Sequence, residues 1–565
     1  MKTLNLHCDY IKFKALKPAL KDIEELFPKQ KLEGNSKDCL VVMVAVEKED
    51  SLESVAKLIE NVKDIAGQVK AENIVLYPYA HLSSNLGKPK IAIEILSEAK
   101  KKLEKDFEVI SAPFGYYKEF ELKVKGHPLS ELSREIISGK DVEADLSDEE
   151  RERMLREISK SKLDTSKLKD NDHRVIGRKL DLWSFNSVAP GMVFWHNKGL
   201  HIKNKLIELW RELHRTAGYQ EISTPQVMDR KLWEISGHWS KYGENNFKTS
   251  YEGRDFLVKP MNCPGGMLVY KTSPKSYKDL PLRVGEIGVV HRVELSGVLA
   301  GLFRVIQFTQ DDAHIFCNEK QLEDEVKRII DLINKTFSYF GLEFDHVELS
   351  TRPEKRIGNE KGWDMAEEAL ENILKKTKMK YKINAGDGAF YGPKIDFHLK
   401  DSLGRTWQCS TIQLDMALPE RFDLVYSDEK GVEKRPIMLH RVVYGSIERF
   451  IGIITEHLNG KFPLWLSPNQ IKVMTLNDSV NSYAKEIYQK LFDEGFMVEL
   501  DDRNESIGKK VREASIERFN YMITVGDKEK EEGVIAVKVR DGKDIEKYSL
   551  NEFVLKLKNE VKERR

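Results

Sequence analysis

The chain has 565 residues, more than one hydrophobic core usually organises, so we expect about three domains. The 92 basic and 92 acidic residues balance, which argues against a general basic coat for nucleic acid but allows a local basic surface. The 5 cysteines are few, odd in number and widely spaced, which argues against a disulfide framework. The first residues lack the pattern of a secretory signal and no apolar run reaches membrane-spanning length, so we expect a cytoplasmic protein without a membrane segment.

Residues 1–139 are predicted to form one compact α/β domain, because apolar strands alternate with amphipathic helices. His81 follows the end of one strand, and Tyr117 and Lys118 follow the end of another. Loops at strand ends often carry ligand groups, although position alone leaves a structural or solvated role open for each. The predicted strands are 39–47, 73–82 and 107–115, and the predicted helices are 51–69 and 90–103.

Residues 140–190 are predicted to be a linker, because the first part of this segment is charged and nearly free of large apolar residues. Ser147 and Glu150 have the spacing of a capping box, which would start a short helix that ends near Lys160. The charge run is most simply a solvated face, and contact with RNA is the alternative.

The block 191–466 holds most of the residues suited to chemistry. A helix is expected over 200–217, followed by a strand over 219–228 in which Pro225 indicates an edge or a bulge. Further on, prolines and a glycine surround Cys263, which predicts a turn that holds this thiol stiffly at the end of a strand.

Within this block, an antiparallel hairpin is predicted over 283–317, with strands over 286–290 and 303–308 joined by a loop that contains glycines. Arg292 leaves the first strand and Arg304 begins the second. Two guanidinium groups would therefore converge on one anionic ligand such as a phosphate or a carboxylate.

The end of the hairpin is polar. Gln310, Asp312 and His314 occupy alternate positions, and alternation on a strand puts all three on one face. A polar strand face is unusual inside a core. The run therefore indicates either a ligand-binding wall or a solvated strand of a charged protein.

Two later segments add further polar groups. Residues 383–416 are predicted to form successive strands that carry Tyr391, Lys394, Gln408 and Gln413 among apolar residues. A strand that begins at His440 becomes a helix after Gly445, with Arg449 in its first turns.

Cys263, His314 and His440 form a candidate metal site. One thiolate and two imidazoles suit zinc, and three protein ligands would leave a fourth position for a substrate. Their spacing forms no local finger, so a buried thiol with two ordinary histidines is the alternative.

The last part of the chain, 467–565, is predicted to contain a mixed sheet of about five strands with helices between them. Its clearest strands are 471–476, 496–500, 521–525 and 533–539.

Several motifs of the central block carry a resemblance: STPQVM with Pro225, HRVELSG with Arg292, FTQDDAHIFC, AFYGPKIDF, WQCSTIQLD and LHRVVYGSIERF. Together they resemble the three motifs and intervening strands of class II aminoacyl-tRNA synthetases, and specifically the threonyl-tRNA synthetase family. PYAHLSS and PFGYYKEFELKVKGHPLSELSR resemble the editing domain of the archaeal type, which is similar to D-aminoacyl-tRNA deacylases. DDRNESIGKKVREA and YMITVGDKEKEEG resemble the anticodon-binding domain.

The resemblance implies a multidomain α/β and α+β fold. A class II antiparallel sheet core at 191–466 would be flanked by an α/β editing domain at 1–139 and an α/β anticodon-binding domain at 467–565, with the linker at 140–190. It implies a homodimer, because motif 1 builds a two-fold interface in this class.

The family's reaction joins L-threonine to tRNA(Thr) with ATP and Mg²⁺, and its zinc site would be Cys263, His314 and His440. Threonine can bind the open position through its amino group and β-hydroxyl, whereas valine cannot, so zinc would reject valine. Serine lacks only a methyl group, which is worth roughly 1–3 kcal/mol of discrimination. A second, hydrolytic site for seryl-tRNA(Thr) is therefore expected in the first domain. By resemblance it contains His81, Lys118 and Glu131, with Tyr117 as a further candidate.

For synthesis, the resemblance implies that Arg292 bridges the threonine carboxylate and the α-phosphate and that Arg449 holds the distal phosphate, with Arg304 as a further phosphate contact. Gln310, Asp312 and Tyr391 would orient threonine. Lys394, Gln408 and Gln413 would line the nucleotide or threonine side. Glu531 and Arg540 match positions that read anticodon bases in the family, where single-stranded bases expose their edges.

Two positions depart from the family pattern: Gly266 stands where histidine is common and Ile306 where arginine is common. Two alternatives remain beside an active, editing threonyl-tRNA synthetase. One is a class II synthetase for another amino acid, which the zinc trio disfavours. The other is a noncatalytic tRNA-binding paralogue, which Arg292 and Arg449 disfavour because RNA binding alone needs no nucleotide site.

Overall fold

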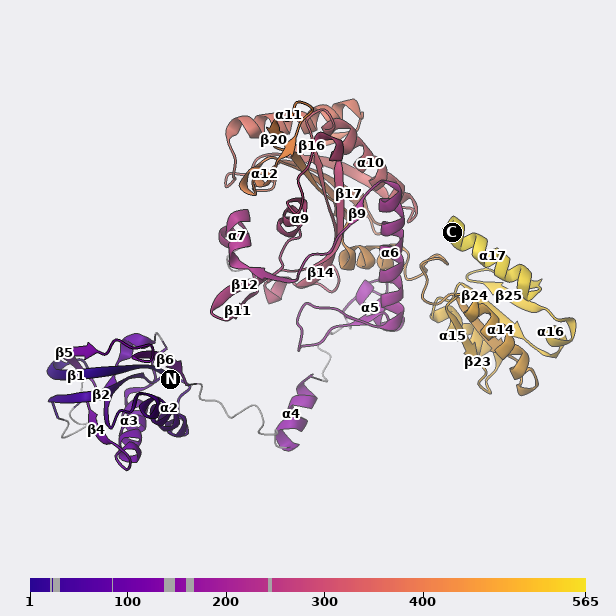
Figure 1. Ribbon diagram of the computed structural model, residues 1–565. Helices are drawn as coiled ribbons and strands as arrows, with labels where there is room; N and C mark the ends of the chain where they lie inside the picture. The colour runs from indigo at the N-terminus through magenta and orange to yellow at the C-terminus, as the bar shows by residue number, and fades with distance from the viewer. Residues whose placement is uncertain are drawn as a thin grey trace. The chain divides into compact units, whose positions relative to one another are not determined.

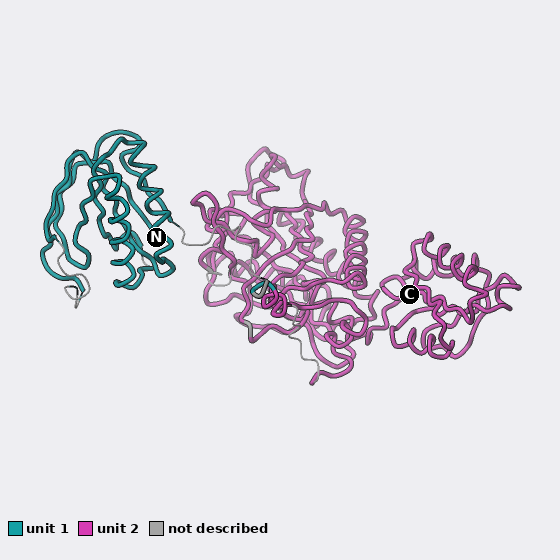
Figure 2. Tube along the Cα trace, turned by 90° about the horizontal axis from the view of Figure 1, so that it is seen from below, with its two compact units in different colours: residues 1–151 teal, residues 152–565 magenta. Residues whose placement is uncertain are grey.

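Figure 1 shows the computed structural model, which describes residues 1–20, 23, 31–83, 85–136, 148–158, 167–241 and 246–564. The chain divides into two compact units, residues 1–151 and residues 152–565, which are coloured separately in Figure 2. Among the described residues, no helix combines the length and the apolar character that a membrane span requires.

The first unit is built on one mixed sheet. Its strands are β1 (Lys2–Pro18), β2 (Glu33–Ala45), β3 (Asn73–Pro78), β4 (Glu108–Ser111), β5 (Tyr116–Val124) and β6 (Glu131–Glu135), and its helices include α2 (Ser54–Val69), α3 (Pro89–Leu103) and the short η1 (Ala80–Leu82). The strand order is β4-β3-β2-β1-β5, with β6 also paired to β1. β2, β3 and β4 are parallel, whereas β1 is antiparallel to β2, β5 and β6.

The two faces of this sheet differ. α2 and α3, side by side in Figure 1, pack their apolar residues against one face, in a cluster that includes Val42 and Ile74. The other face carries a second cluster formed mainly by strand residues, among them Phe13, Val41 and Tyr77. The predicted strands and both predicted helices are present with shifted ends, and the long β1 adds a strand that the sequence analysis did not assign.

The second unit contains the antiparallel core sheet that the resemblance implies. Its strands are β9 (Gln220–Glu221), β13 (Leu282–His291), β14 (Gln307–Cys317), β15 (Glu343–Ser350), β16 (Tyr381–Asn384), β17 (Lys394–Lys400), β18 (Thr406–Asp415) and β21 (Ile437–Ser446). The order is β16-β15-β17-β18-β21-β14-β13-β9. Neighbours from β15 to β13 are antiparallel, and β9 and β16 join in parallel at the edges.

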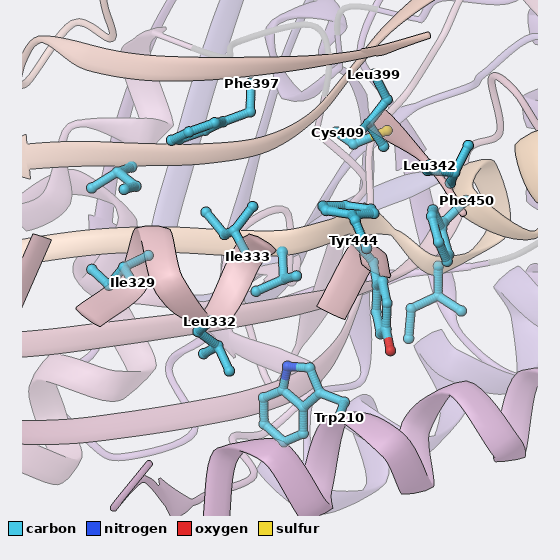
Figure 3. Close-up of a cluster of buried hydrophobic side chains, with 14 of the residues drawn as sticks. Trp210, Ile329, Leu332, Ile333, Leu342, Phe397, Leu399, Cys409, Tyr444 and Phe450 are labelled. Atoms are coloured by element: carbon cyan, nitrogen blue, oxygen red, sulfur yellow. The ribbon is translucent and has the colours of Figure 1, made fainter. Parts of the chain in front are cut away.

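Helices cover one face of this sheet and form the largest core. Those that contribute most are α6 (Asn197–Thr216), α10 (Leu322–Ser338), α11 (Glu360–Lys376) and α13 (Ile447–His457). Figure 3 shows Trp210 of α6, Ile333 of α10 and Phe397 of β17 in this core. Because alternate residues of a strand face opposite sides, packing Phe397 and its neighbours inward leaves the intervening polar residues on the other face.

Smaller elements complete this part of the unit. They are α4 (Asp148–Ile158), α5 (His173–Lys179), β7 (Trp183–Ser184), β8 (Phe194–Trp195), β10 (Val227–Asp229), α7 (Arg230–Ser236), α8 (His238–Lys241), β11 (Lys248–Tyr251), β12 (Arg254–Val258), α9 (Cys263–Tyr270), η3 (Tyr277–Asp279), η4 (Ser296–Val298), α12 (Ala417–Arg421), β19 (Tyr426–Ser427) and β20 (Glu433–Lys434). A helix is thus present where the capping box predicted one, but Ser147 itself lies outside the described residues.

The segment predicted as a linker, 140–190, includes residues that pack in the core. Ile176, Leu182 and Trp183 are buried in the main cluster of the second unit. These apolar residues are too few, in too short a stretch, to give a clear helical period within a charged sequence. Their burial is decided by tertiary packing.

The hairpin differs from its prediction in one respect. β13 and β14 pair antiparallel as expected, but β14 begins at Gln307 instead of 303, so Arg304 lies in the connecting loop 292–306 and does not begin a strand. The strand does not extend back to Phe303, because the backbone N–H of Phe303 donates to Ala300 O and that of Ile306 donates to Gly191 O.

Two other local predictions need correction. The predicted strand 219–228 is two short strands in different sheets, β9 and β10, with Pro225 between them. Cys263 lies at the first position of α9 and not in a turn, because Pro264 fits the first turn of a helix, where its missing N–H has no partner to lose.

The last part of the chain confirms the predicted mixed sheet. The order is β23-β22-β24-β25-β26, parallel from β23 to β24 and antiparallel from β24 to β26. The elements are β22 (Ile471–Thr475), η5 (Asp478–Val480), α14 (Asn481–Asp493), β23 (Val498–Asp501), α15 (Ile507–Ile516), β24 (Tyr521–Val525), α16 (Asp527–Glu532), β25 (Ile535–Val539), β26 (Ile545–Tyr548) and α17 (Leu550–Glu563).

Candidate active site and metal centre

One row of polar side chains crosses the core sheet. His314 on β14 lies opposite His440 on β21, His440 lies opposite Gln413 on β18, and Gln413 lies opposite Lys394 on β17. Directly opposite residues on neighbouring antiparallel strands project from the same face. The register therefore gathers groups that are far apart in the sequence on the face that the core helices leave free.

Cys263 completes a candidate metal centre with two residues of this row. The ligand atoms of Cys263, His314 and His440 all lie within 4.8 Å of one another, and all three residues are buried. Among the described residues, His314 Nε2 is a buried nitrogen without a hydrogen-bond partner. A thiolate and two imidazoles are the donors that zinc prefers, so the residues present fit a zinc ion, which would also satisfy the orphaned nitrogen.

A carboxylate holds the second histidine of the centre. His440 Nε2 lies 2.8 Å from Asp415 Oδ2, and Asp415 Oδ1 accepts the backbone N–H groups of Ala417 and Leu418. This arrangement fixes the imidazole ring and leaves Nδ1 as its ligand atom. Carboxylates commonly orient metal-binding histidines in this way.

Burial sets the protonation of the centre. It lowers the pKa of His314 to about 4, so this imidazole is neutral and its lone pair is available to a metal. Burial also raises the pKa of the Cys263 thiol well above its ordinary value. A bound cation would replace the thiol proton, because it stabilises the thiolate that burial disfavours.

The predicted face of β14 adjoins this centre. Gln310, Asp312 and His314 lie at alternate positions of one strand, as expected. Asp312 Oδ2 accepts from Asn262 Nδ2 at 3.2 Å and lies 3.6 Å from His314 Nε2. Gln310 Oε1 is buried without a hydrogen-bond partner among the described residues. This wall offers acceptors beside the metal position.

A tyrosine and a glutamine form the opposite side. Tyr391 is buried and donates its hydroxyl to Gln413 Oε1 at 2.6 Å. The Tyr391 ring lies 4.9 Å from the ring of His440. Both groups therefore border the metal centre.

Lys394 and Gln408 meet on one carboxylate. Lys394 Nζ lies 2.9 Å from Asp396 Oδ2 and 3.0 Å from Asp387 Oδ2, and Gln408 Nε2 donates to Asp396 Oδ1 at 2.6 Å. Gln408 is exposed, so of the two it has the freer approach to a ligand.

Two of the three predicted arginines are partly buried beside aromatic rings. Arg292 Nε donates to Pro260 O at 3.3 Å, and its guanidinium lies 5.2 Å from the Phe308 ring centre. The Arg449 guanidinium lies 5.4 Å from the Trp407 ring centre. Such rings hold a guanidinium flat and leave its edge for an anion.

Arg304 is placed differently. Its side chain is exposed and its guanidinium forms an ion pair with Glu294 at 2.9 Å. Arg292 and Arg304 thus have different partners, and their joint contact with one anion stays a prediction.

Two buried carboxylates that the sequence analysis missed hold the strand-to-helix turn before Arg449. Asp311 accepts the backbone N–H groups of Val443, Tyr444 and Gly445 at 2.8–3.1 Å. Glu448 accepts Thr309 N at 2.7 Å and Lys203 Nζ at 2.9 Å. Gly445 has φ +78°, a backbone conformation that glycine adopts readily. The sequence signals available for this turn were the adjacent carboxylates Asp311 and Asp312 and the glycine at position 445.

A buried histidine connects helix α13 to the loop 292–306. His173 Nδ1 lies 2.6 Å from Glu456 Oε1 on α13, and His173 Nε2 accepts from Leu302 N at 3.0 Å in the loop 292–306. The sequence placed His173 outside any motif, so it had no signal of its own.

The residues that depart from the family pattern also lie here. A Cβ added at Gly266 would lie 3.5 Å from His314 Nδ1, so this position faces the metal centre. Ile306 is buried, and Gly191 lies against it. At position 306, apolar packing therefore takes the place of the arginine that is common in the family.

In the first unit, two of the predicted editing residues, Lys118 and Glu131, lie on the face opposite α2 and α3, whereas Tyr117 precedes Lys118 on β5 and projects from the other face. Lys118 lies opposite Ala15 and Glu131 opposite Leu6, both on β1, and this register puts Lys118 and Glu131 on that face. Lys118 Nζ donates to Pro113 O at 2.9 Å and lies 5.0 Å from the Tyr77 ring centre.

Aromatic contacts lead from Lys118 towards His81. Tyr77 contacts Tyr79, whose ring lies 5.5 Å from that of the exposed His81. Tyr117 is 57% exposed and lies next to Lys17. Burial lowers the pKa of Lys118 to about 8.

The two predicted anticodon residues have unlike surroundings. Glu531 is exposed on α16. Arg540 donates to the carbonyl oxygens of Arg518, Lys461 and Phe462, which engages three of its five N–H groups.

Comparison with known protein families matches three parts of the chain. Residues 1–136 match the archaea-specific editing domain of threonyl-tRNA synthetase, residues 247–458 the class II tRNA synthetase core domain (G, H, P, S and T), and residues 470–560 the anticodon-binding domain. The threonine–tRNA ligase of Clostridium botulinum (strain Kyoto / Type A2) is 50% identical over 425 residues, which cover 73% of this chain and 67% of that protein. The chain belongs to the threonyl-tRNA synthetase family. This confirms the resemblance and the fold class.

Other relatives agree with this assignment. The threonine–tRNA ligase of Carboxydothermus hydrogenoformans is 54% identical over 397 residues, which cover 70% of this chain. The chain spans 62% of the length of that relative. The RNA-binding domain of threonyl-tRNA synthetase from Cryptosporidium parvum superposes with a TM-score of 0.67 at 41% identity, covering 69% of this chain and 98% of that one. A structure described as a threonyl-tRNA synthetase of Aeropyrum pernix has a TM-score of 0.60 at 28% identity, covering 70% and 97%.

Proposed function

We propose that this synthetase activates L-threonine with ATP, transfers it to tRNA(Thr) and hydrolyses seryl-tRNA(Thr) in its first domain. The observation that carries the proposal is the convergence of Cys263, His314 and His440 on the polar face of a class II core sheet. A class II enzyme for another amino acid would not need this ligand set, and a paralogue that only binds tRNA would need neither the ligand set nor Arg292 and Arg449.

A zinc ion bound by these three residues would supply one open coordination position for the amino group and β-hydroxyl of threonine. Mg²⁺ would accompany ATP. Asp312 would accept a hydrogen bond from the β-hydroxyl, since its carboxylate lies 3.6 Å from His314 Nε2. Gln310, Tyr391 and Gln413 would orient the rest of the amino acid.

The arginines would bind the charges of the reaction. Arg292 would hold the threonine carboxylate against the α-phosphate, and Arg449 the distal phosphate, with Arg304 as a further contact. The carboxylate attacks the α-phosphate and pyrophosphate leaves, so positioning and charge stabilisation matter more than a protein nucleophile. Lys394 and Gln408 would line the nucleotide side.

The remaining partners would meet other parts of the chain. Glu531 and Arg540 would contact anticodon bases, the exposed carboxylate accepting from a base edge and the guanidinium donating with its remaining N–H groups. We also infer that the enzyme is a homodimer, because class II enzymes with motif 1 are two-fold symmetric. We infer a cytoplasmic location as well.

ATP–pyrophosphate exchange with the zinc-loaded protein tests the synthetic function. Exchange should depend on threonine, occur more weakly with serine and be nearly absent with valine. Exchange with a different amino acid would support another specificity, and no exchange with any amino acid would support the paralogue that only binds tRNA.

The editing role predicts a separation of activities. His81→Ala and Lys118→Ala should each keep threonine charging and accumulate seryl-tRNA(Thr), because the synthetic site lies in another domain. Charging and deacylation are measured with labelled amino acids. Lys123→Ala is the matched control, since Lys123 lies on the same strand, is exposed and pairs with Asp9. Unchanged deacylation by both variants would remove these residues from editing.

Editing should also depend on pH through Lys118. Its pKa of about 8 means that the ammonium is complete near pH 6 and is lost as pH rises through 8. If the ammonium holds the substrate, deacylation corrected for spontaneous ester hydrolysis should fall over pH 7.5–9, by about tenfold per pH unit above the pKa. Lys118→Arg keeps its charge over this range, so its profile should be flat. A wild-type profile as flat as that of the variant would contradict the prediction.

A further inference from the structure

A second group of metal-ligating side chains lies on the polar face of the core sheet, towards its other edge. It comprises His346 and Glu348 on β15 and His398 on β17, whose ligand atoms all lie within 4.8 Å of one another. We propose that these three residues bind a second transition-metal ion, separate from the one at Cys263.

The strand register builds this group. His346 and His398 lie directly opposite each other on antiparallel strands, and their rings stack 4.3 Å apart at an interplanar angle of 11°. Glu348 lies two residues after His346 and therefore projects from the same face. The side chains retain about a fifth of their exposure, 21% for His346 and Glu348 and 18% for His398, so a bound ion would remain open to solvent on one side.

Two of the three ligands are already oriented by other polar groups. His346 Nδ1 lies 2.7 Å from Asp345 Oδ2, which leaves Nε2 directed at Glu348. Asn384 Nδ2 donates to Glu348 Oε2 at 2.9 Å. Carboxylate and amide partners of this kind fix the ligands of metal sites.

The third ligand is the one that needs a partner. Among the described residues, His398 Nε2 is buried without a hydrogen bond, and Glu348 Oε2 lies 3.6 Å from it. A buried polar atom left unsatisfied is unfavourable. A cation between His398 and Glu348 would satisfy both groups.

Two nitrogen–oxygen distances in the group are close to those between the ligands of a zinc ion. Ligands about 2.0–2.1 Å from zinc lie roughly 3.3–3.4 Å from one another. His346 Nε2 is 3.2 Å from Glu348 Oε1, and His398 Nε2 is 3.6 Å from Glu348 Oε2. Because the two rings stack nearly parallel, at least one imidazole has to turn for both nitrogens to face the ion.

The ligand chemistry selects the class of ion. Two imidazoles and one carboxylate suit Zn²⁺, Co²⁺ or a similar borderline ion, whereas Mg²⁺ and Ca²⁺ prefer oxygen ligands. The group contains no thiolate, which distinguishes it from the centre at Cys263. On β17 it is separated from Lys394 by Asp396, the residue that Lys394 and Gln408 share.

The test uses the full chain, stripped of metal, dialysed and reloaded with Co²⁺ alone. Bound cobalt is counted by elemental analysis, and a thiolate–cobalt charge-transfer band in the near ultraviolet reports the Cys263 centre. The wild-type chain should hold two equivalents. Cys263→Ser should lose one equivalent together with the band, and His398→Ala should lose one equivalent and keep the band.

His196→Ala is the matched control, because His196 also contacts a carboxylate, Asp181, at 2.6 Å but belongs to no group of three ligands among the described residues. This variant should hold two equivalents. Glu348→Gln changes the charge with little change in shape. Like His398→Ala, it should hold one equivalent, and a wild-type circular dichroism spectrum would show that it is folded. The proposal is overturned if the wild-type chain holds one equivalent that Cys263→Ser removes, or if both Glu348→Gln and His398→Ala keep two.

Discussion

Arg292→Lys should lower threonine-dependent ATP–pyrophosphate exchange by about 10²- to 10³-fold, the usual cost of removing one donor from a developing charge. Lysine keeps the charge but cannot bridge a carboxylate and a phosphate with two parallel N–H groups. The Phe308 ring, 5.2 Å from the guanidinium, also orients a planar group better than an ammonium. The loss should fall on kcat/KM for both ATP and threonine.

Arg254→Lys is the control for this substitution. Arg254 is 61% exposed and pairs with Asp229, so its replacement should change exchange less than twofold. Equal losses in the two variants would mean that the Arg292 effect comes from general destabilisation. Unimpaired exchange by Arg292→Lys would remove Arg292 from the bridging role.

Cys263→Ser should abolish most of the discrimination between threonine and valine. A site that binds a substrate hydroxyl through polar groups can reject the analogue without it by roughly 10⁴–10⁵, whereas a pocket without such groups reaches on the order of 10². The ratio of exchange efficiencies for threonine and valine should therefore fall by about 10²- to 10³-fold, mainly through loss of threonine activation.

The control is Cys317→Ala, which removes a buried thiol of β14 that belongs to the apolar core and not to the metal centre. It should keep both the metal content and the preference for threonine. If Cys263→Ser keeps the wild-type preference, the specificity for threonine does not depend on this thiol.

Much of the site was predictable because strands impose a simple rule. Gln310, Asp312 and His314 had to share a face once their segment formed a strand, and β14 gives this result. Long periodic segments such as α6 and β21 were also clear. The motifs identified the family because the catalytic groups lie in short, specific patterns.

The meeting of Cys263 with His314 and His440 was not predictable from periodicity. It depends on which strands are neighbours and on the register between them, and both are set by the packing of the whole sheet. The same reason hides the group at His346 and His398, which is adjacent only across two strands. The residue types suggested the first group and the resemblance supported it, but neither pointed to the second.

Local predictions failed where the chain uses its backbone groups in an unexpected way. Phe303 and Ile306 have strand-forming side chains, but the N–H of Phe303 bonds within the loop and that of Ile306 bonds to Gly191 O. Arg540 was predicted as an anticodon-reading residue, and the sequence did not indicate that its guanidinium donates to three backbone carbonyls. Neither pairing leaves a signal in residue type or spacing.

The two sides of β14 perform different tasks. Asp311 holds the turn that leads to Arg449, while its neighbours Gln310 and Asp312 face the proposed amino-acid site. A redesign of amino-acid specificity would therefore have to vary only alternate positions of this strand. Randomising Asp311 together with its neighbours would yield many variants that lose ATP activation whatever amino acid they accept. Conversely, the positions of Gln310 and Asp312 can be varied while Asp311 still anchors the turn and His314 is kept as a metal ligand.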